Sequence, residues 1–465
     1  MSLASSLSRL LVSTPDQPAL QIGSETYTWA DLGRQVAGAL DYLDGLDLSP
    51  EQVLASKTED PFHRVVWMLA ASWAGYSWFL SSASNAKETQ NLVVVEDDYG
   101  PSDRVLPVPA IWPEQKPHWL LLSSGTTGAA KLLPLTSSQI EANAWGAKQR
   151  LALTTSDRWL CVLPLGHIAG ASIIARACYV GFTVILEPRF VPGEFHRRVT
   201  EAEVTVTSLV PTMLGRIVSH SPEPPQTLRV VMLGGAAFPN HLKESAAHWP
   251  IWLTWGMSET ASQVATSPLA EALEEGLEPI KGHRVEVEAN GQLRIIGPTA
   301  PGGSWLSADQ GEVNETGRVR VLGRSDDVVK VGGNRVNLAR VRRVFARAKP
   351  ELQFELFTIS DEVYGRQLGV ALIEPEDGEV DDLSGVASTL DVWERPHWVL
   401  PLKTFPLTPR FKIDRDRLAE LCLEARQERL SNKERLVLLP TPSLNTTDSE
   451  SDSFVYTDSE GRVTL

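Results

Sequence analysis

Six small residues, four of which carry hydroxyl groups, follow an apolar run and precede a lysine in LLLSSGTTGAAKLLPLT (120–136). They are Ser123, Ser124, Gly125, Thr126, Thr127 and Gly128, and the lysine is Lys131. Glycines allow the backbone to present consecutive N–H groups, the hydroxyls add donors, and the lysine adds a charge. The loop therefore suits a polyphosphate, although such a run can also be an ordinary turn. It is not a Walker loop, because Lys131 is not followed by Ser or Thr.

Two further segments offer groups that a nucleotide needs. VVMLGGAAFP (230–239) ends an apolar strand with Gly234, Gly235 and Ala236, which form either a tight turn or a bare backbone that a flat ring can approach. LTWGMSETAS (253–262) contains Trp255, Gly256, Met257, Ser258 and Glu259. The tryptophan is either an ordinary buried side chain or an aromatic face for a base, and the carboxylate can hold a hard cation.

Two segments in the last third of the chain carry charged and glycine residues at positions that suggest function. GRSDDVVKVGGNRV (323–336) combines Arg324, Asp326, Gly332 and Gly333 at what we expect to be a domain junction. FPLTPRFKIDRDRL (405–418) presents Lys412 after two prolines.

Strand-like and helix-like segments alternate around these motifs. A short strand followed by a helix is expected at 25–46, where the apolar residues Leu32, Val36, Ala39, Leu40 and Leu43 recur at helical spacing. A buried helix leading into a strand is expected at 63–80, and strand-then-helix pairs at 204–218 and 228–246. The hydroxyl-rich loop follows a strand at about 118–122 and precedes a helix, for which Ser138 and Glu141 have the spacing of a capping box. The alternation predicts an α/β fold with much parallel sheet.

The chain is long enough for more than one domain. Its 465 residues exceed what one core usually organises. We expect a large N-terminal α/β domain with layered sheets over 1–324 and a small, mobile C-terminal α+β domain over 325–430. Strands in 353–361 and 366–374 and a helix in 414–430 would build the small domain. Residues 431–465 are rich in Ser, Thr, Asp and Glu, which predicts a flexible tail.

Composition limits the partners that the protein could have. Apolar residues make up 42% and charged residues 22%, and the net charge of -15 argues against non-specific binding of nucleic acid or of an anionic membrane. The sequence has no apolar run long enough to span a membrane. Its three cysteines lack a C-x-x-C pattern, and its first residues make a poor secretory signal. A reducing, cytoplasmic setting is expected, and the sequence does not indicate an oligomeric state.

Together these motifs resemble, in order and over about residues 15–425, the adenylate-forming superfamily of acyl-CoA synthetases and adenylation domains. The hydroxyl-rich loop with Lys131 is similar to the phosphate loop of that family. WGMSE is similar to its aromatic-Gly-x-Thr-Glu segment, GRSDD with GGNRV to its hinge motif, and PLTPRFK to its C-terminal lysine motif. The resemblance implies an enzyme that uses ATP, Mg²⁺, coenzyme A and a small-molecule carboxylic acid.

The resemblance also implies two half-reactions. The acid attacks the α-phosphate of ATP to give an acyl-adenylate and pyrophosphate, and a thiol then displaces AMP. Attack of one anion on another needs charge neutralisation and alignment more than proton transfer. In this scheme the hydroxyl-rich loop holds the β- and γ-phosphates and Glu259 holds Mg²⁺. Trp255 and the glycine pair enclose the adenine.

The remaining implied roles fall on the C-terminal third. Asp309, in SWLSADQGEV, accepts hydrogen bonds from the ribose hydroxyls, with Arg324 near the same sugar. Lys412 reaches the carboxylate and the α-phosphate. Asp326 is the hinge for a rotation between the half-reactions, after which Gly332 and Gly333 face the pantetheine channel.

The sequence departs from the family pattern at several of these positions. Ser307 and Ala308 replace the usual Thr-Gly before Asp309, and Phe411 replaces the usual Gly before Lys412. The basic residues Arg340 and Arg342 replace acidic ones after the hinge motif.

Within the superfamily, the chain looks most like the o-succinylbenzoate–CoA ligases of menaquinone and phylloquinone synthesis. LPLGHIAGASIIARACYVG (163–181) has their style, with His167 at an acyl-pocket position where a catalytic or substrate contact is implied. Arg176 lies in an apolar run and needs a partner, which is either a second carboxylate of the substrate or an acidic side chain of the protein.

Three alternatives remain open at this stage. The acid could be another aryl or fatty acid, or the enzyme could transfer its adenylate to a separate carrier protein. A nucleotide-binding relic without activity is a third reading, which the presence of Lys131, Glu259, Asp309, Arg324 and Lys412 argues against.

Overall fold

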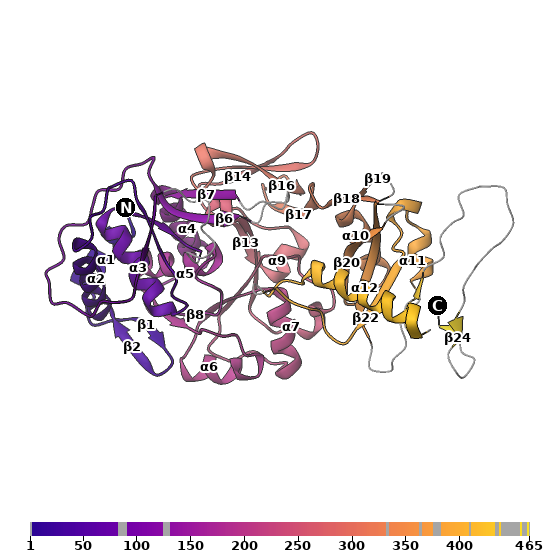
Figure 1. The fold of residues 1–465 in the computed structure, drawn as a ribbon, viewed down its shortest axis with the longest axis horizontal. Helices are drawn as coiled ribbons and strands as arrows, with labels where there is room; N and C mark the ends of the chain where they lie inside the picture. Colours follow the sequence, from indigo (N-terminus) through magenta and orange to yellow (C-terminus); the bar gives the residue numbers. More distant parts are fainter. Residues whose placement is uncertain are drawn as a thin grey trace. The chain divides into compact units, whose positions relative to one another are not determined.

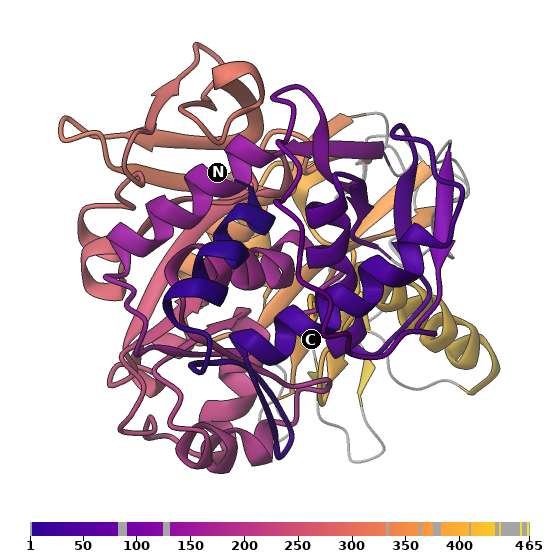
Figure 2. The ribbon, with the colours of Figure 1, turned by 90° about the vertical axis from the view of Figure 1, so that its left-hand side faces the viewer.

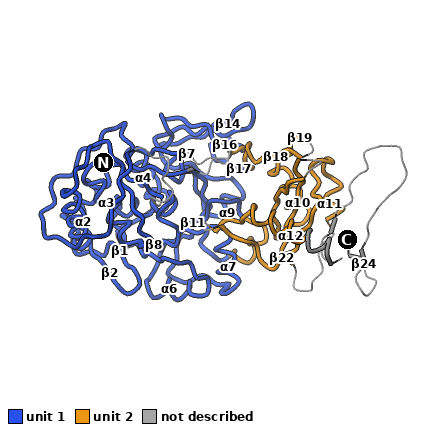
Figure 3. Tube along the Cα trace, viewed as in Figure 1, with its two compact units in different colours: residues 1–238, 248–307, 311–321 blue, residues 239–247, 308–310, 322–465 orange. Residues whose placement is uncertain are grey.

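The computed structural model describes residues 2–81, 91–123, 131–331, 334–361, 365–374, 383–408 and 411–432, and three short strands beyond them. Its contacts divide the chain into two compact units (Figure 3). Unit 1 comprises residues 1–238, 248–307 and 311–321, and unit 2 comprises 239–247, 308–310 and 322–465. The division runs through two strands near residues 308 and 322, and segment 239–247 groups with the C-terminal unit. A domain boundary after residue 324 stays a prediction.

An eight-stranded sheet forms the centre of unit 1, in the order β13-β12-β11-β10-β8-β9-β1-β2. The strands are β1 Pro18–Ile22, β2 Glu25–Thr28, β8 Arg158–Cys161, β9 Thr183–Leu186, β10 Val206–Leu209, β11 Val230–Leu233, β12 Ile251–Met257 and β13 Ser262–Pro268. The six strands from β12 to β1 pair in parallel, and β13 and β2 run antiparallel at the two edges. The inner strands β9, β10 and β11 are buried along their whole length, as expected where both faces of a parallel sheet are covered.

A five-stranded sheet lies in the same unit, in the order β5-β3-β4-β6-β7. Its strands are β3 Val53–Ser56, β4 Ser77–Phe79, β5 Leu92–Val95, β6 Pro117–Ser123 and β7 Lys131–Thr136. Strands β5, β3, β4 and β6 are parallel, and β7 returns antiparallel to β6. The predicted strand at about 118–122 is therefore confirmed as β6.

Helices between the strands supply the cover for these sheets (Figures 1 and 2). They are α1 Leu3–Ser13, α2 Trp29–Asp44, α3 Pro61–Ala74, α4 Ser137–Arg150, α5 Ile168–Val180, α6 Phe195–Glu201, α7 Pro211–His220 and α9 Leu269–Glu274. Helix α2 buries the residues whose spacing predicted it, Leu32, Val36, Ala39, Leu40 and Leu43. Helices α4 and α5 pack against each other. The predicted α/β architecture with much parallel sheet is confirmed.

The predicted start of α4 is wrong by two residues. The capping box consists of Thr136 and Gln139, not of Ser138 and Glu141. The Gln139 N–H donates to Thr136 Oγ1 at 3.3 Å, and the Thr136 N–H donates to Gln139 Oε1 at 2.9 Å. Thr136 is the last residue of β7, so the helix begins where the strand pairing ends.

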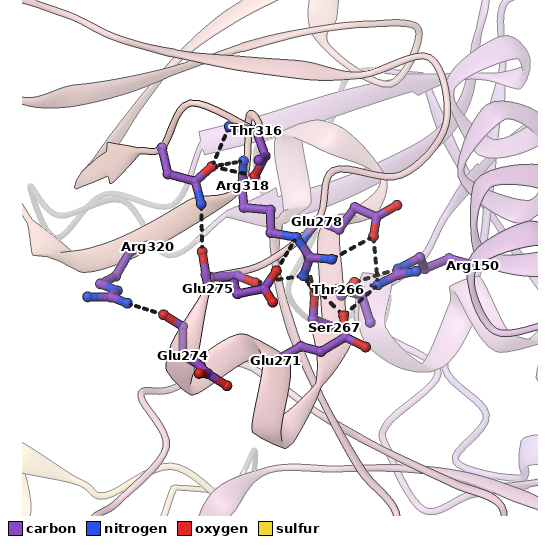
Figure 4. A network of polar contacts seen from close by, with 12 residues as sticks. Arg150, Thr266, Ser267, Glu271, Glu274, Glu275, Glu278, Thr316, Arg318 and Arg320 are labelled. Carbon is purple, nitrogen blue, oxygen red and sulfur yellow. Dashed lines mark hydrogen bonds and ion pairs between the residues drawn. The ribbon is translucent and has the colours of Figure 1, made fainter.

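A four-stranded sheet follows the edge strand β13 in the chain, in the order β14-β15-β16-β17. Its strands are β14 Arg284–Val287, β15 Gln292–Ile296, β16 Ser304–Val313 and β17 Val319–Arg324. A network of charged side chains joins the start of β17 to α9 and to β13 (Figure 4). Arg318, just before β17, contacts Glu271 at 3.1 Å, Glu275 at 3.3 Å and Glu278 at 3.4 Å, and Arg150 contacts Glu278 at 3.1 Å.

Removing the centre of this network should destabilise unit 1. We expect Arg318→Ala to lower the free energy of unfolding by about 2–3 kcal/mol, because three carboxylates lose a largely buried cation. Arg320→Ala is the matched control, because that exposed arginine lies two residues further on, within β17, and its hydrogen bond among the described residues is to the Glu274 carbonyl, at 3.0 Å. Urea unfolding of both variants measures the difference. Equal losses would contradict a structural role for the network.

Unit 2 is built mainly on an antiparallel hairpin and helices packed against it. Its elements are α8 Leu242–Ser245, β18 Val328–Val331, β19 Asn334–Asn337, α10 Leu338–Ala348, β20 Phe354–Asp361, β21 Gly365–Ile373, α11 Ser384–Ser388, β22 Trp398–Leu402 and α12 Arg415–Asn432. Strands β20 and β21 are antiparallel, and β22 joins β21 in parallel. The strands and the helix that were expected at 353–361, 366–374 and 414–430 are confirmed.

Part of the predicted tail forms strands. β23 Val437–Leu438 pairs antiparallel with β22, through Val399–Val437 and Trp398–Leu438, and β24 Tyr456–Thr457 pairs with β25 Val463–Thr464. The rest of 433–465 lies outside the described residues. A flexible tail over 431–465 stays a prediction.

Ion pairs within unit 2 explain the basic residues that depart from the family pattern. Arg342 contacts Glu355 at 2.7 Å and Asp327 at 3.4 Å, and Arg415 contacts the same two carboxylates at 2.9 and 3.1 Å. Arg340 pairs with Glu394. These arginines therefore connect α10 to β20 and to the segment before β22.

Candidate active site

Three parallel strands of the central sheet end beside predicted site residues of unit 1. Strands β8, β10, β11 and β12 are neighbours in the central sheet and point the same way, so their carboxyl ends share one edge. His167 follows β8, the glycine pair follows β11, and Glu259 follows β12. Ligands bind outside the carboxyl ends of the strands in open parallel sheets. The predicted acid-pocket, adenine and metal residues therefore belong to one edge.

The glycine pair after β11 has a structural reason as well as a possible functional one. A Cβ on Gly234 would lie 2.7 Å from Thr254 Cγ2, and Gly235 has a φ of +80°. A side chain would be crowded at the first position and strained at the second. Gly235 and Ala236 are exposed. Their backbone therefore remains open to a ligand.

In this structure Trp255 is an ordinary buried side chain, which is one of the two roles considered for it from the sequence. Its side chain is only 8% exposed and belongs to the apolar cluster that includes Val264, Ile295 and Val319. At the neighbouring Gly256 the register between β12 and β13 shifts, and a Cβ there would lie 1.7 Å from the Ser262 carbonyl oxygen. Contact of Trp255 with a base stays a prediction.

Glu259 lies in a short, tight turn at the carboxyl end of β12. Ser258–Thr260 form one turn of 3-10 helix, and the Thr260 hydroxyl donates to the Met257 carbonyl at 3.2 Å. The next two residues, Ala261 and Ser262, have φ values of +53° and +109°. Two consecutive non-glycine residues at positive φ are unusual and persist only where their surroundings enforce them. The turn keeps the Glu259 side chain partly exposed.

The side chains present here fit a magnesium ion that is shared with phosphates. Within the described residues, no group of three or more His, Cys, Asp or Glu side chains could hold a metal by itself. Mg²⁺ at nucleotide sites is commonly held by one or two carboxylates together with phosphate oxygens and water. A single accessible carboxylate such as Glu259 meets that requirement.

The hydroxyl-rich loop connects two strands that are paired up to its ends. β6 ends at Ser123 and β7 begins at Lys131, and these two residues are partners in the ladder. Ser124, Gly125, Thr126, Thr127 and Gly128 lie outside the described residues. The loop follows the carboxyl end of β6, which is parallel to β4. Phosphate binding stays a prediction.

His167 is the N-cap residue of α5, at the end of a turn that touches both sheets. Its carbonyl accepts the N–H groups of Gly170 at 3.1 Å and Ala171 at 2.9 Å. The Ser81 hydroxyl, just after β4, donates to the Gly166 carbonyl at 3.5 Å. The carboxyl edges of the two sheets therefore meet beside His167, which is half-buried. Its role toward the substrate stays a prediction.

Arg176 is fully buried in α5, nine positions after His167. Its Nη2 donates to Asn143 Oδ1 of α4 at 2.9 Å, and its guanidinium lies 5.5 Å from the Trp159 ring. Nε and Nη1 have no hydrogen-bond partner among the residues that the structure describes. Burial lowers the pKa of Arg176 to about 9, so the group is still charged at pH 7. An ion pair with an acidic side chain, the structural alternative, is not formed within the described residues.

The structure brings three predicted residues of unit 2 together. Arg324 Nη1 lies 3.7 Å from Asp309 Oδ1, and both carboxylate oxygens of Asp326 accept from Arg324, at 2.7 and 2.6 Å. Asp309 is 9% exposed, and Arg324 is exposed. The predicted ribose acceptor and the predicted hinge are thus joined by one guanidinium. Gly332 and Gly333 lie outside the described residues.

Lys412 is exposed at the end of a tight turn. Its N–H donates to Thr408 Oγ1 at 3.3 Å, and its carbonyl accepts the Thr408 N–H at 2.8 Å. Phe411, where the family usually has glycine, has a φ of +57°. The turn therefore keeps the left-handed backbone that glycine would adopt without strain, at a cost of about 1–2 kcal/mol for an L-residue.

Two buried side-chain amides of unit 1, close to Glu259 and Arg176, were not predicted from the sequence. Gln139 Nε2 donates to the Glu259 carbonyl at 3.2 Å and to the Thr299 carbonyl at 2.8 Å. Asn143 Nδ2 donates to the Gln263 carbonyl at 2.9 Å while its Oδ1 accepts from Arg176. The T-x-x-Q pattern of a capping box was the available signal for the first, and nothing marked the second.

Comparison with known proteins supports this reading. Residues 77–307 match the model of the family described as AMP-binding enzyme. The 2-succinylbenzoate–CoA ligase of Bacillus licheniformis is 28% identical over 294 residues, which cover 57% of this chain and 62% of that protein. This match spans less than two thirds of that relative.

Solved structures show the fold. o-Succinylbenzoate coenzyme A synthetase from Bacillus subtilis, in complex with ATP and a magnesium ion, gives a TM-score of 0.74 at 21% identity, covering 89% of this chain and 98% of that one. The same enzyme with its acyl-adenylate intermediate gives 0.73 at 21% identity, covering 89% and 97%. The chain therefore has the fold of the adenylate-forming enzymes. Among the described residues, no helix is long and apolar enough to cross a membrane.

Proposed function

We propose that this protein is an ATP-dependent acyl-CoA ligase that works through an acyl-adenylate, and that its acid is o-succinylbenzoate. One observation carries the proposal: the segments that resemble the family's acid, adenine and metal motifs follow neighbouring parallel strands at one sheet edge. The AMP-binding domain and the names of the relatives support the same reading.

In the proposed reaction the side chains bind and align anions. The loop from Ser123 to Lys131 would hold the β- and γ-phosphates, and Glu259 would hold Mg²⁺, which supplies neutralising charge. Asp309 and Arg324 would hold the ribose. Lys412 would neutralise charge between the acid and the α-phosphate, and coenzyme A would then take the acyl group from AMP. These groups align the reactants and stabilise charge, and none of them needs to transfer a proton.

A dicarboxylic acid is the substrate class that best fits Arg176. A buried cation with two donors that find no partner in the described part of the chain is costly to keep, and an anion would satisfy it. His167 and Arg176 are nine residues apart on one helix, a rise of about 13 Å. Arg176 Nη2 donates to Asn143, whose Nδ2 donates to the Gln263 carbonyl opposite Gly256, near the carboxyl end of β12 where the acid would bind. The second carboxylate of o-succinylbenzoate would be its partner.

Replacing Arg176 with Met should separate binding from stability. We expect KM for o-succinylbenzoate to rise about 10–100-fold, the loss of one charged hydrogen-bond partner of about 1.5–3 kcal/mol. A monocarboxylic aryl acid should be affected much less. Because the free protein loses an unpaired buried charge, its melting temperature should stay the same or rise. Equal losses for both acids, with a lower melting temperature, would make Arg176 structural.

A panel of carboxylic acids tests the proposal against its alternatives. The purified protein is given ATP and Mg²⁺ with each acid, and pyrophosphate release is measured before and after coenzyme A is added. Thioester formation with coenzyme A removes the carrier-protein alternative. Release with only a different aryl or fatty acid would replace the substrate, and no release with any acid would favour the nucleotide-binding relic.

The proposal places the reaction in the cytoplasm, where ATP and coenzyme A are available. The three cysteines Cys161, Cys178 and Cys422 are free and buried, which agrees with a reducing compartment. The partners are the acid and the two cosubstrates.

A further inference from the structure

Gln139 is buried between the start of α4 and the turn that carries Glu259. Its side chain is 5% exposed, and its amide uses both ends. Oε1 accepts from the Thr136 N–H at 2.9 Å, and Nε2 donates to the carbonyls of Glu259 and Thr299 at 3.2 and 2.8 Å. One side chain thus ties together three segments that are far apart in the sequence.

The three segments all bear on the candidate site. Thr136 ends β7, the strand that leaves the hydroxyl-rich loop. Glu259 is the candidate magnesium ligand, and it precedes the two residues with positive φ. Thr299 is fully buried between β15 and β16, and its hydroxyl lies 2.7 Å from His283 Nε2. The Gln139 amide therefore connects the Glu259 turn to the end of β7 and to the buried segment between β15 and β16.

We propose that Gln139 is a positioning residue for the metal: by holding the Glu259 carbonyl, it fixes the direction of the Glu259 carboxylate toward Mg²⁺ on ATP. The inference rests on the proposed function for the role of Glu259. The backbone at Ala261 and Ser262 is strained, so this turn needs an external contact to hold its shape. A carboxylate in the wrong direction would still be present but would bind the ion less well.

Gln139→Glu tests the proposal, because it replaces only the side-chain NH2 group with an oxygen. The glutamate keeps an acceptor for the Thr136 N–H and so keeps the helix cap. It replaces the donor with a second acceptor that faces two carbonyl oxygens, so the Glu259 turn loses its anchor. Gln139→Met is the second variant, because it removes the donor without adding charge and guards against misfolding of the first.

The readout is the affinity for ATP with and without Mg²⁺, measured by calorimetry on folded protein. In wild type we expect Mg²⁺ to tighten ATP binding, and in both variants we expect this gain to fall by about 10-fold or more, as for other groups that orient a metal ligand. Affinity for ATP without Mg²⁺ should change by less than about threefold. Binding is measured without an acid, so the result does not depend on turnover.

Gln17→Glu is the matched control. Gln17 Nε2 also donates to two carbonyls, of Thr155 at 2.7 Å and Gly181 at 2.9 Å, but these precede β8 and β9 at the opposite edge of the central sheet. This variant should lower the melting temperature and leave the Mg²⁺ gain unchanged. A wild-type gain in Gln139→Glu and Gln139→Met would overturn the positioning role. Wild-type protein that does not bind ATP at all would instead overturn the proposed function.

Discussion

Lys412→Ala should lower the rate of acyl-adenylate formation by about 10²–10³-fold, the usual cost of removing one charge-stabilising group from a transition state. Thioester formation from supplied acyl-adenylate should change little, because a contact that is made in one conformation serves one half-reaction. The backbone bonds to Thr408 do not involve the lysine side chain, so the turn should survive. Pyrophosphate exchange and single-turnover thioester formation measure the two steps.

Two further variants test whether the effect depends on the position and the charge of Lys412. Lys403→Ala removes another exposed lysine of unit 2 and should leave both half-reactions unchanged. Lys412→Arg keeps the charge but changes its shape and should recover part of the adenylation rate. A similar loss of both half-reactions in Lys412→Ala would contradict the assigned role.

Asp326→Pro should impair the other half-reaction, thioester formation, and largely spare adenylation. Proline fixes φ near −65°, so a hinge at this position could no longer rotate freely. We expect adenylation to persist within about threefold and thioester formation to fall by about 10-fold or more, as expected when a conformational step becomes limiting. Stopped-flow measurement of each half-reaction separates the two.

Asp326→Ala is the necessary control, because Asp326 also holds Arg324 through two hydrogen bonds. Alanine removes those bonds but leaves the backbone free to rotate. If both variants lose the same half-reaction to the same degree, the effect comes from Arg324 and not from the hinge. Unchanged turnover with coenzyme A in Asp326→Pro would remove the hinge assignment.

The fold could be predicted because its signals are local. In α2 the 3.6-residue spacing of Leu32, Val36 and Leu43 predicted both the helix and its buried face, and strand and helix alternate visibly elsewhere. The cap of α4 could not be chosen this way, because T-S-S-Q and S-Q-I-E both have plausible spacing. The pairing of Thr136 with Pro117 decides it, and that contact is with another strand.

Candidate site residues could be proposed from the sequence where the residue type itself suggests the chemistry. They could not be proposed where a role depends on contacts with residues far away in the sequence. Glu259 and Asp309 were predicted from their motifs and remain predictions as site residues, whereas Gln139 contacts carbonyls more than a hundred residues away, which no motif indicates. Arg176 was expected to need a partner, but only the packing of α4 on α5 provides Asn143. The acidic partners of Arg340 and Arg342 lie on other segments, so the basic residues made no sense in the sequence alone.

The most direct test of the account is the product formed from o-succinylbenzoate, ATP, Mg²⁺ and coenzyme A by the wild-type protein. We predict o-succinylbenzoyl-CoA by mass spectrometry, with one AMP and one pyrophosphate for each thioester, and the acyl-adenylate when coenzyme A is omitted. Formation of ADP and phosphate, or of no adenylate and no thioester from this acid, would contradict the account.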